Sequence, residues 1–197
     1  MKATFHKERQ FVFSIDFETD LTDKQIQEGI LSLDWSNANT TSFKNRYELY
    51  DNDIPYDNAV KYIIKYLKGD VFKRTIIDLL YQDTDFVQCW QIDAEKMFNN
   101  TGTFAAVVRD NPGYTTSCHL DNRRIVITGM YYFIEGDDPN QSTYFYTSKD
   151  SENELRMPTG FNRGWLMGNL HSTWHRGFNR SDRDRYAILF GIVIKQR

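Results

Sequence analysis

The sequence predicts a single, mainly β domain of the sandwich or jelly-roll type, with helices packed on the outside of one sheet. The first observation is a change of period. Apolar residues recur at helical spacing up to about residue 80, and from about residue 86 they alternate in short runs. The second is turn chemistry, because sequences such as Asn111-Pro112-Gly113 separate these runs. The third is the length of 197 residues with 40% hydrophobic content, which suits one domain with a real core.

Three helices are expected in the N-terminal part, and each has a recognisable start signal. The signals are a capping box formed by Thr22 and Gln25, then Pro55, and then Asp70 as a cap. Gly69 is the stop signal between the second and third helices. The apolar stripes that follow are Ile26, Ile30 and Leu33 in the first helix, residues 56–68 in the second, and Phe72, Ile76, Leu79 and Leu80 in the third. Such stripes are typical of core packing rather than of a cofactor site.

Seven strands are expected from aromatic and β-branched runs between turns. They are residues 11–17, 86–92, 104–108, 125–134, 142–147, 164–167 and 186–194. All but the first lie in the second part of the chain, which is therefore expected to form the β core.

Charge and cysteine content exclude several classes of protein. The net charge of −3 offers no basic surface for nucleic acid. The two cysteines, Cys89 and Cys118, do not form a CxxC pair, which excludes zinc ribbons and dithiol redox sites. No apolar run approaches the length of a membrane span. We therefore expect a soluble, cytoplasmic protein whose partners include neither nucleic acid nor membranes.

A candidate metal site begins with His119 and Asp121. In an extended segment, side chains two residues apart point to the same side. They can supply two ligands of the two-histidine, one-carboxylate site that holds Fe(II) and leaves open positions. The third ligand must come from a neighbouring strand, and His171 and His175 are the candidates. We prefer His175, which Arg185 follows at an interval of ten residues; the interval from His171 is fourteen.

Arg185 stands at the mouth of an apolar strand and needs an anionic partner. Its planar guanidinium matches a carboxylate through two parallel hydrogen bonds. The residues on its side of the strand leave space in front of it; they are Ala187, Leu189 and Gly191. On the strand at 125–134, Tyr132 shares a face with Met130 and Thr128, so its hydroxyl can donate to the same carboxylate, while Tyr131 points to the core.

Together these residues resemble the Fe(II)/2-oxoglutarate-dependent oxygenases, in particular their prolyl-hydroxylase-type branch. The resemblance covers residues 104–194 and rests on His119-x-Asp121, on Tyr131-Tyr132-Phe133, and on His175 followed by Arg185-Tyr186-Ala187-Ile188. It implies a double-stranded β-helix core (jelly-roll or cupin-like) at about 86–197. The region at about 1–85 would support this core, with helices on the outer face of the major sheet.

The resemblance also implies roles for residues. His119, Asp121 and His175 would hold Fe(II), and Arg185 would bind the distal carboxylate of 2-oxoglutarate with Tyr132 as its hydroxyl partner. With O2 as the other cosubstrate, 2-oxoglutarate would be decarboxylated to succinate and CO2 while an unactivated C–H bond is hydroxylated. A prolyl or other peptidyl side chain is the expected substrate, with a free amino acid, sugar or other small metabolite as the open alternative.

Three further residues precede the metal motif and are candidates for substrate contact, namely Arg109, Tyr114 and Trp90. Each is equally well explained as a sheet or loop residue with a satisfied polar tip. Two other functions compete with the oxygenase. A binding or structural jelly-roll module predicts that Arg185 pairs with an internal carboxylate and that the metal residues do not converge. A cupin-like isomerase or lyase explains the metal residues but gives Arg185 and Tyr132 no task.

Overall fold

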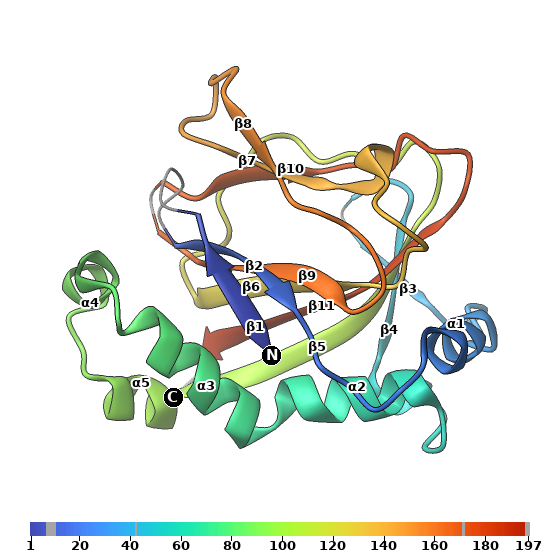
Figure 1. Cartoon of the computed structure of the whole chain (residues 1–197), viewed down its shortest axis with the longest axis horizontal. Coiled ribbons are helices and arrows are strands. Elements are labelled where there is room, and N and C mark those ends of the chain that lie inside the picture. The colour runs from blue at the N-terminus through green and yellow to red at the C-terminus, as the bar shows by residue number, and fades with distance from the viewer. Residues whose placement is uncertain (7–10, 42, 171, 196–197) are drawn as a thin grey trace.

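Two antiparallel sheets lie face to face in the computed structural model, which describes residues 1–6, 11–41, 43–170 and 172–195 (Figure 1). Within these ranges the major sheet has the strand order β1-β2-β9-β6-β11-β5-β4-β3, and the minor sheet has the order β10-β7-β8. The strands of the major sheet are β1 (Lys2–Phe5), β2 (Val12–Asp16), β3 (Asn39–Thr40), β4 (Arg46–Tyr50), β5 (Thr101–Asp110), β6 (Ile125–Tyr132), β9 (Arg163–Gly168) and β11 (Arg185–Ile194). Those of the minor sheet are β7 (Thr143–Tyr146), β8 (Glu154–Arg156) and β10 (Trp174–Gly177). The fold is therefore mainly β and of the double-stranded β-helix type, which confirms the predicted fold class.

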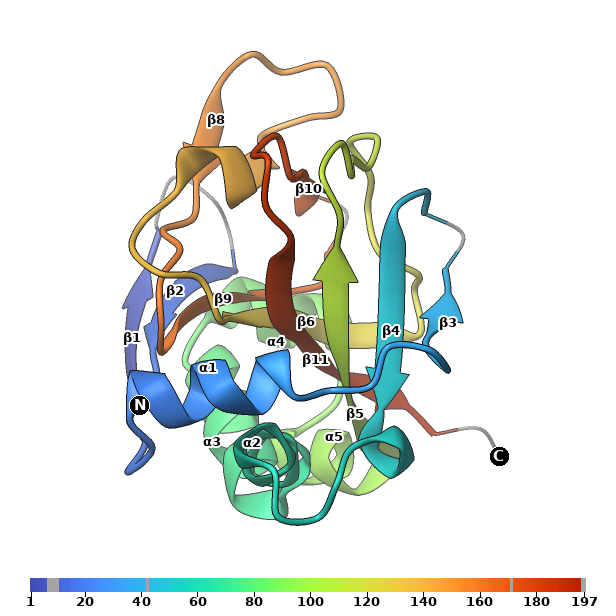
Figure 2. The same ribbon diagram turned by 90° about the vertical axis from the view of Figure 1, so that its right-hand side faces the viewer.

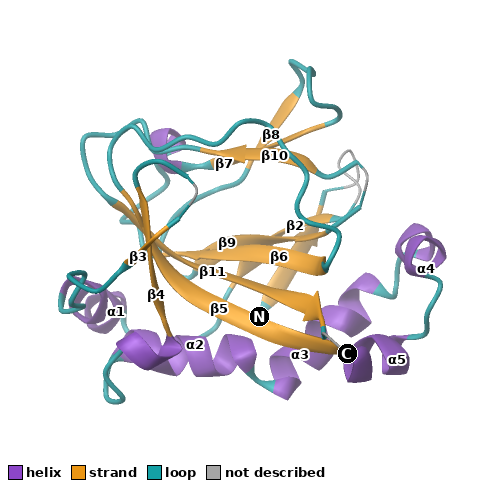
Figure 3. Cartoon of the chain, turned by 180° about the vertical axis from the view of Figure 1, so that it is seen from behind, coloured by secondary structure: helices purple, strands orange, loops and turns teal. Residues whose placement is uncertain are grey.

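Helices cover the outer face of the major sheet, where α2, α3 and α5 run beneath the strands (Figure 3). The helices of the described chain are α1 (Asp23–Leu31), α2 (Ala59–Lys68), α3 (Asp70–Leu80), α4 (Thr84–Trp90) and α5 (Ala94–Asn100), with short 3-10 turns at Asp51–Asp53 and Pro139–Gln141. Their apolar stripes form one core with the sheet; for example, the rings of Phe72 and Phe190 meet edge to face with centroids 5.5 Å apart. Figure 2 shows α2, α3 and α5 at one side of the major sheet and β8 and β10 of the minor sheet at the other.

The starts of the predicted helices are close to those observed. Thr22 and Gln25 form the expected capping box before α1. Helix α2 begins at Ala59 rather than at Pro55, because the side chain of Asn58 accepts a hydrogen bond from the backbone N–H of Val60 and so caps a later start. Asp70 is the first residue of α3 and not its cap.

The strand predicted at residues 86–92 is wrong, because residues 86–90 belong to helix α4 and the helix ends at Trp90. The carboxylate of Asp83 accepts hydrogen bonds from the backbone N–H groups of Asp85 and Phe86 and caps the helix. Phe86 packs its ring against Phe11 and Tyr81. A strong helix cap thus outweighs the modest β-propensity of a short aromatic run.

The alternation predicted for β11 is confirmed. Ala187 and Leu189 face the minor sheet and pack in an inner core with Met130, Tyr132, Phe145 and Trp165. Ile188, Phe190 and Ile192 face the helices, as does Tyr131 on β6. The inner face of β11 therefore points into the space between the two sheets.

The N-terminal part contributes strands as well as helices. Strands β1 to β4 all precede residue 86 and belong to the major sheet. Among the described residues, no helix combines the length and apolar character that a bilayer span requires.

Candidate metal centre and its cavity

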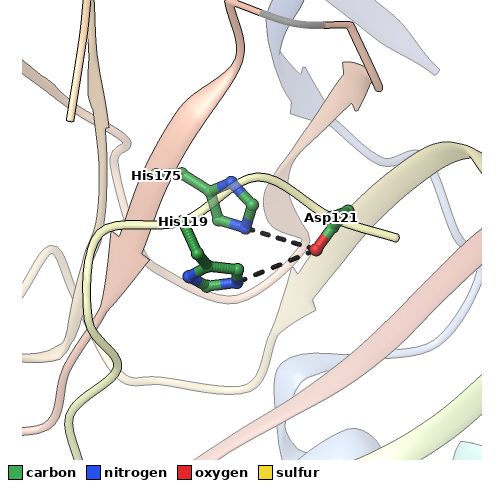
Figure 4. Close-up of side chains that lie close together, drawn as sticks. All are labelled: His119, Asp121 and His175. Carbon is green, nitrogen blue, oxygen red and sulfur yellow. Dashed lines mark ion pairs between the residues drawn. The ribbon is translucent and has the colours of Figure 1, made fainter. Parts of the chain in front are cut away.

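The three residues singled out as metal ligands lie together. His119 stands directly opposite His175 of β10, and each backbone N–H donates to the carbonyl oxygen of the other, at 2.9 and 3.0 Å. Oδ1 of Asp121 lies 3.8 Å from Nε2 of His119 and 3.7 Å from Nε2 of His175 (Figure 4). One ligand atom from each residue falls within 4.8 Å of the others. His171, the alternative third ligand, lies outside the described residues.

Hydrogen bonds orient these side chains for coordination. Nδ1 of His119 lies 2.8 Å from the carbonyl oxygen of Ser117, and Nδ1 of His175 lies 3.1 Å from that of Thr173. Because a carbonyl only accepts, each Nδ1 carries the hydrogen, and the lone pair remains on Nε2. The hydroxyl of Thr128 donates to Oδ2 of Asp121 and leaves Oδ1 facing the two rings. The group thus has the outer hydrogen bonds that commonly fix metal ligands.

Burial also favours the ligand form of His175. Loss of hydration lowers the pKa of this ring, and the nearby Asp121 carboxylate only partly opposes the effect. The imidazole is therefore neutral at neutral pH, as metal coordination requires.

A cavity of about 270 Å³ is lined by the three candidate ligands and by residues of both sheets. The minor sheet contributes Thr143 and Gly177 to its wall, and the major sheet contributes Arg46 and Arg185. Gly177 follows His175 by two residues, which is about 7 Å along a strand. A Cβ atom at Gly177 would lie 3.5 Å from Nη2 of Arg185, so the absence of a side chain keeps space open in front of that guanidinium.

Arg185 is fully buried, and one edge of its guanidinium faces an internal carboxylate. Its Nε and Nη2 donate to Oδ2 of Asp110 at 2.9 and 2.5 Å. Its Nη1 donates to the carbonyl oxygens of Gln141 and Phe178 at 3.0 and 3.2 Å. Arg46 approaches the same carboxylate, with Nε 2.6 Å from Oδ1 and Nη2 2.9 Å from Oδ2.

The three charges are direct neighbours across strands, since Asp110 of β5 pairs in register with Arg46 of β4 and with Arg185 of β11. Burial opposes ionisation of Asp110, but the two guanidinium groups outweigh it and hold the pKa of the carboxyl below its usual value. The cluster is therefore an ionised Arg–Asp–Arg group at neutral pH, with one positive charge in excess.

Tyr132 does not line the cavity itself but forms hydrogen bonds with two residues that do. Its hydroxyl lies 3.0 Å from Oγ1 of Thr143 and accepts a hydrogen bond from Nε1 of Trp165, also at 3.0 Å. Burial raises the pKa of Tyr132, so the hydroxyl stays neutral. Thr143 and Trp165 line the cavity, whereas Tyr132 stands behind them.

The three candidate substrate residues are scattered. Tyr114 lines the cavity beneath Arg46, whose guanidinium carbon lies 4.4 Å from the ring centroid. Arg109 lies over the rings of Trp35 and Tyr47 instead. Trp90 lines a second cavity of about 340 Å³, and this cavity shares Leu120 and Asp121 with the first. Nε1 of Trp90 is buried and has no hydrogen-bond partner among the described residues.

Sequence reasoning gave no role to five residues of the site: Arg46, Asp110, Thr128, Thr143 and Gly177. The sequence held one signal for Asp110: if the strand predicted at 104–108 is extended by two residues, it ends at Asp110, which can then pair with Arg185 on the neighbouring strand. The strand that carries Arg46 has no strong apolar alternation, so the sequence alone held no sign of it. Gly177 stands two residues after His175, and this spacing was a usable signal for the same face of a strand.

Known proteins match this chain in structure rather than in sequence, since no family model and no curated protein sequence matches it. A prolyl-4-hydroxylase from Pseudomonas putida aligns over 95% of this chain and 94% of its own, with 13% identity and a TM-score of 0.61. A prolyl hydroxylase from Trichoplax adhaerens, solved with a hypoxia inducible factor peptide fragment, aligns over 95% and 85%, with 16% identity and a TM-score of 0.62. HygX from Streptomyces hygroscopicus, solved with nickel and 2-oxoglutarate bound, aligns over 98% and 88%, with 9% identity and a TM-score of 0.59.

These likenesses run along almost the whole chain. The chain therefore has the fold of the 2-oxoglutarate-dependent oxygenases and is similar in structure to prolyl hydroxylases of that superfamily.

Proposed function

We propose that this protein is an Fe(II)- and 2-oxoglutarate-dependent dioxygenase that hydroxylates an unactivated C–H bond. The observation that carries the proposal is the convergence of His119, Asp121 and His175 on the wall of a cavity in this fold. Two neutral imidazoles and one carboxylate are the donor set of non-haem Fe(II) sites, and three protein ligands leave positions open for small molecules. The residues present therefore fit the metal.

The chain's own contribution is placement. Ser117 and Thr173 fix the two rings through their carbonyl oxygens, and Thr128 fixes the carboxylate. When bound, the iron with 2-oxoglutarate and O2 supplies the oxidising chemistry, which yields succinate and CO2. The apolar wall formed by Leu189, Met130 and Trp165 limits the access of water to the reacting centre.

The far end of the cavity suits an anionic cosubstrate. We assign the distal carboxylate of 2-oxoglutarate to the space beside Arg185, with Tyr132 acting through the hydroxyl of Thr143. The distance from His175 to Gly177 along β10, about 7 Å, is close to the length of a five-carbon dicarboxylate. HygX, a structural relative, was solved with nickel and 2-oxoglutarate bound, which supports this choice of cosubstrate.

A prolyl or other peptidyl side chain is our proposed substrate, because two of the structural relatives are named prolyl hydroxylases. The second cavity shares Asp121 with the first and is lined by Trp90. Nε1 of Trp90, which has no hydrogen-bond partner among the described residues, can donate to a carbonyl oxygen of a peptide. We place substrate entry there, with the chain acting as one domain.

The test is an anaerobic titration with Fe(II), with and without 2-oxoglutarate, followed by visible absorption. We expect a weak band when both are present, and succinate when O2 is admitted. His175→Ala should lose the band, while His6→Ala, at a histidine that pairs with Ser14 and does not line the cavity, should keep it. Absence of both the band and succinate in the wild-type protein refutes the proposal.

A metal enzyme that does not use 2-oxoglutarate is the second candidate. It is favoured by one observation, the pairing of Arg185 with the internal carboxylate of Asp110, which the binding-module alternative also predicted. The convergent ligands argue against a module without metal. Metal binding that 2-oxoglutarate leaves unchanged would support this second candidate.

A further inference from the structure

We propose that Arg46 supplies the positive charge that holds the distal carboxylate of a dicarboxylic 2-oxo acid in this cavity. The proposal rests on the function proposed above and extends it to a residue outside the oxygenase motif. Arg46 comes from β4, more than a hundred residues before Arg185, and it lines the same cavity.

The argument begins with charge. Asp110 and Arg185 are both fully buried and form a close ion pair, which is neutral as a unit. A neutral pair has little net attraction for an external anion, so Arg185 alone does not make an anion site. Arg46, which is 7% exposed, adds one positive charge to the pair. An incoming carboxylate is therefore attracted by this additional positive charge.

The free hydrogen-bond donors point to the same conclusion. Nε and Nη2 of Arg46 bind Asp110, and Nη1 makes no hydrogen bond to any described residue. Arg185 has committed Nε, Nη1 and one hydrogen of Nη2. The remaining Nη2 hydrogen of Arg185 and the Nη1 group of Arg46 can both bind a carboxylate, which each guanidinium favours strongly. Asp110 holds the two guanidinium groups in place.

The positive charges around the whole cavity then equal the negative charge of a dianion. A divalent metal with Asp121 carries one positive charge, and the Arg–Asp–Arg cluster carries another. A 2-oxo acid with two carboxylates neutralises both, with one negative charge at each end. A 2-oxo acid with a single carboxylate neutralises only the metal end and leaves the cluster's buried positive charge unpaired, which is costly. The geometry thus selects dicarboxylates through Arg46.

The experiment compares ligands and variants on the Ni(II)-loaded protein by calorimetry, so that no turnover is needed. The probes are 2-oxoglutarate and pyruvate, which shares the metal-binding end but lacks the distal carboxylate. Arg46→Gln should weaken 2-oxoglutarate binding by about 30-fold or more. Pyruvate binding and Ni(II) binding should change by less than about threefold, a difference small in free energy.

Three further variants separate the effect of charge from an effect on folding. Arg46→Gln combined with Asp110→Asn leaves Arg185 as the excess cation, and we expect it to recover at least part of the 2-oxoglutarate affinity. Arg156→Gln is the matched control, because this arginine pairs with Asp137 and does not line the cavity. Thermal unfolding of every variant verifies that the fold is intact. If the variants that carry Arg46→Gln do not fold, Arg46→Lys should keep the preference for 2-oxoglutarate over pyruvate, because lysine retains the positive charge.

The outcomes are distinct. Folded Arg46→Gln protein that binds 2-oxoglutarate as tightly as the wild type overturns the role of Arg46 and leaves the proposed function standing. Equal weakening of 2-oxoglutarate and pyruvate also overturns it, because the effect would then lie at the metal end. Wild-type protein that binds Ni(II) but neither ligand refutes the proposed function itself.

Discussion

Replacing Gly177 by alanine should separate stability from cosubstrate binding. Gly177 lies on β10 and lines the cavity, and its missing side chain leaves space beside Arg185 and Thr143. An added Cβ would lie 3.5 Å from Nη2 of Arg185 and 3.8 Å from Oγ1 of Thr143, which are ordinary van der Waals distances. The protein without ligand should therefore accept the methyl group without strain.

The two expected effects have opposite signs. Alanine in place of a strand glycine reduces the entropy of the unfolded chain, so we expect a gain of about 0.4–1 kcal/mol in the free energy of unfolding. The same methyl group occupies the space assigned to a carboxylate oxygen beside Nη2 of Arg185. Loss of one hydrogen bond to a charged group costs about 1.5–3 kcal/mol. The affinity for 2-oxoglutarate should therefore fall by about 10- to 150-fold.

The assay is calorimetry of 2-oxoglutarate binding to the Ni(II)-loaded protein, together with urea unfolding of the ligand-free protein. Gly102→Ala is the matched control, because this glycine also lies in a strand and its added Cβ would meet only Cγ of Lys195, at 4.0 Å. It should leave the affinity unchanged. If Gly177→Ala protein is folded and binds 2-oxoglutarate normally, the carboxylate does not occupy the space in front of Arg185, and the assignment is refuted.

Three more predictions concern the candidate metal centre and the buried charges. His175→Ala removes one of the three proposed ligands and should abolish Ni(II) binding measured by calorimetry; retained affinity would mean that this ring is not a ligand. Thr128→Val removes the hydrogen bond to Oδ2 of Asp121 and should lower Ni(II) affinity by about 10- to 100-fold, while an unchanged affinity would show that the carboxylate needs no such support. The pKa of Asp110 is lowered in the folded protein, so its ionised form stabilises the fold above about pH 4, the unfolded value, and this stability is lost as pH falls further through the folded pKa. Melting temperatures measured between pH 6 and pH 3 should fall in that acid range, and a flat profile would contradict the role given to this carboxylate.

Most of the fold features that were predicted correctly follow from local sequence patterns. The capping box at Thr22 and the alternation along β11 depend on neighbours in sequence, and both appear as expected. The segment at 86–92 was predicted wrongly because its aromatic residues suit a strand, whereas the deciding group, Asp83, lies just before it. Elements with weak patterns, such as β4, were not predicted at all.

In the candidate site, too, some residues could be predicted from local patterns and others could not. His119 and Asp121 are two residues apart, so their shared direction follows from strand geometry alone. The partners of Arg185 depend instead on the register of β4, β5 and β11, which brings Arg46 and Asp110 beside it from distant segments. Such pairings are set by tertiary packing and cannot be predicted from local patterns in a single sequence.

The arrangement of Arg46, Asp110 and Arg185 on three adjacent strands ties cosubstrate binding to the completion of folding. Residues 86–197 contain every residue of the oxygenase motif, yet without β4 their buried pair of Asp110 and Arg185 would be neutral. Docking of β4 joins segments 64 residues apart along the chain, a contact that forms only after a large loop has closed. A ligand that needs this contact stabilises the complete fold over any partly folded form in which β4 is detached. On the role proposed for Arg46, only a chain in which β4 has joined the sheet can bind the dianion.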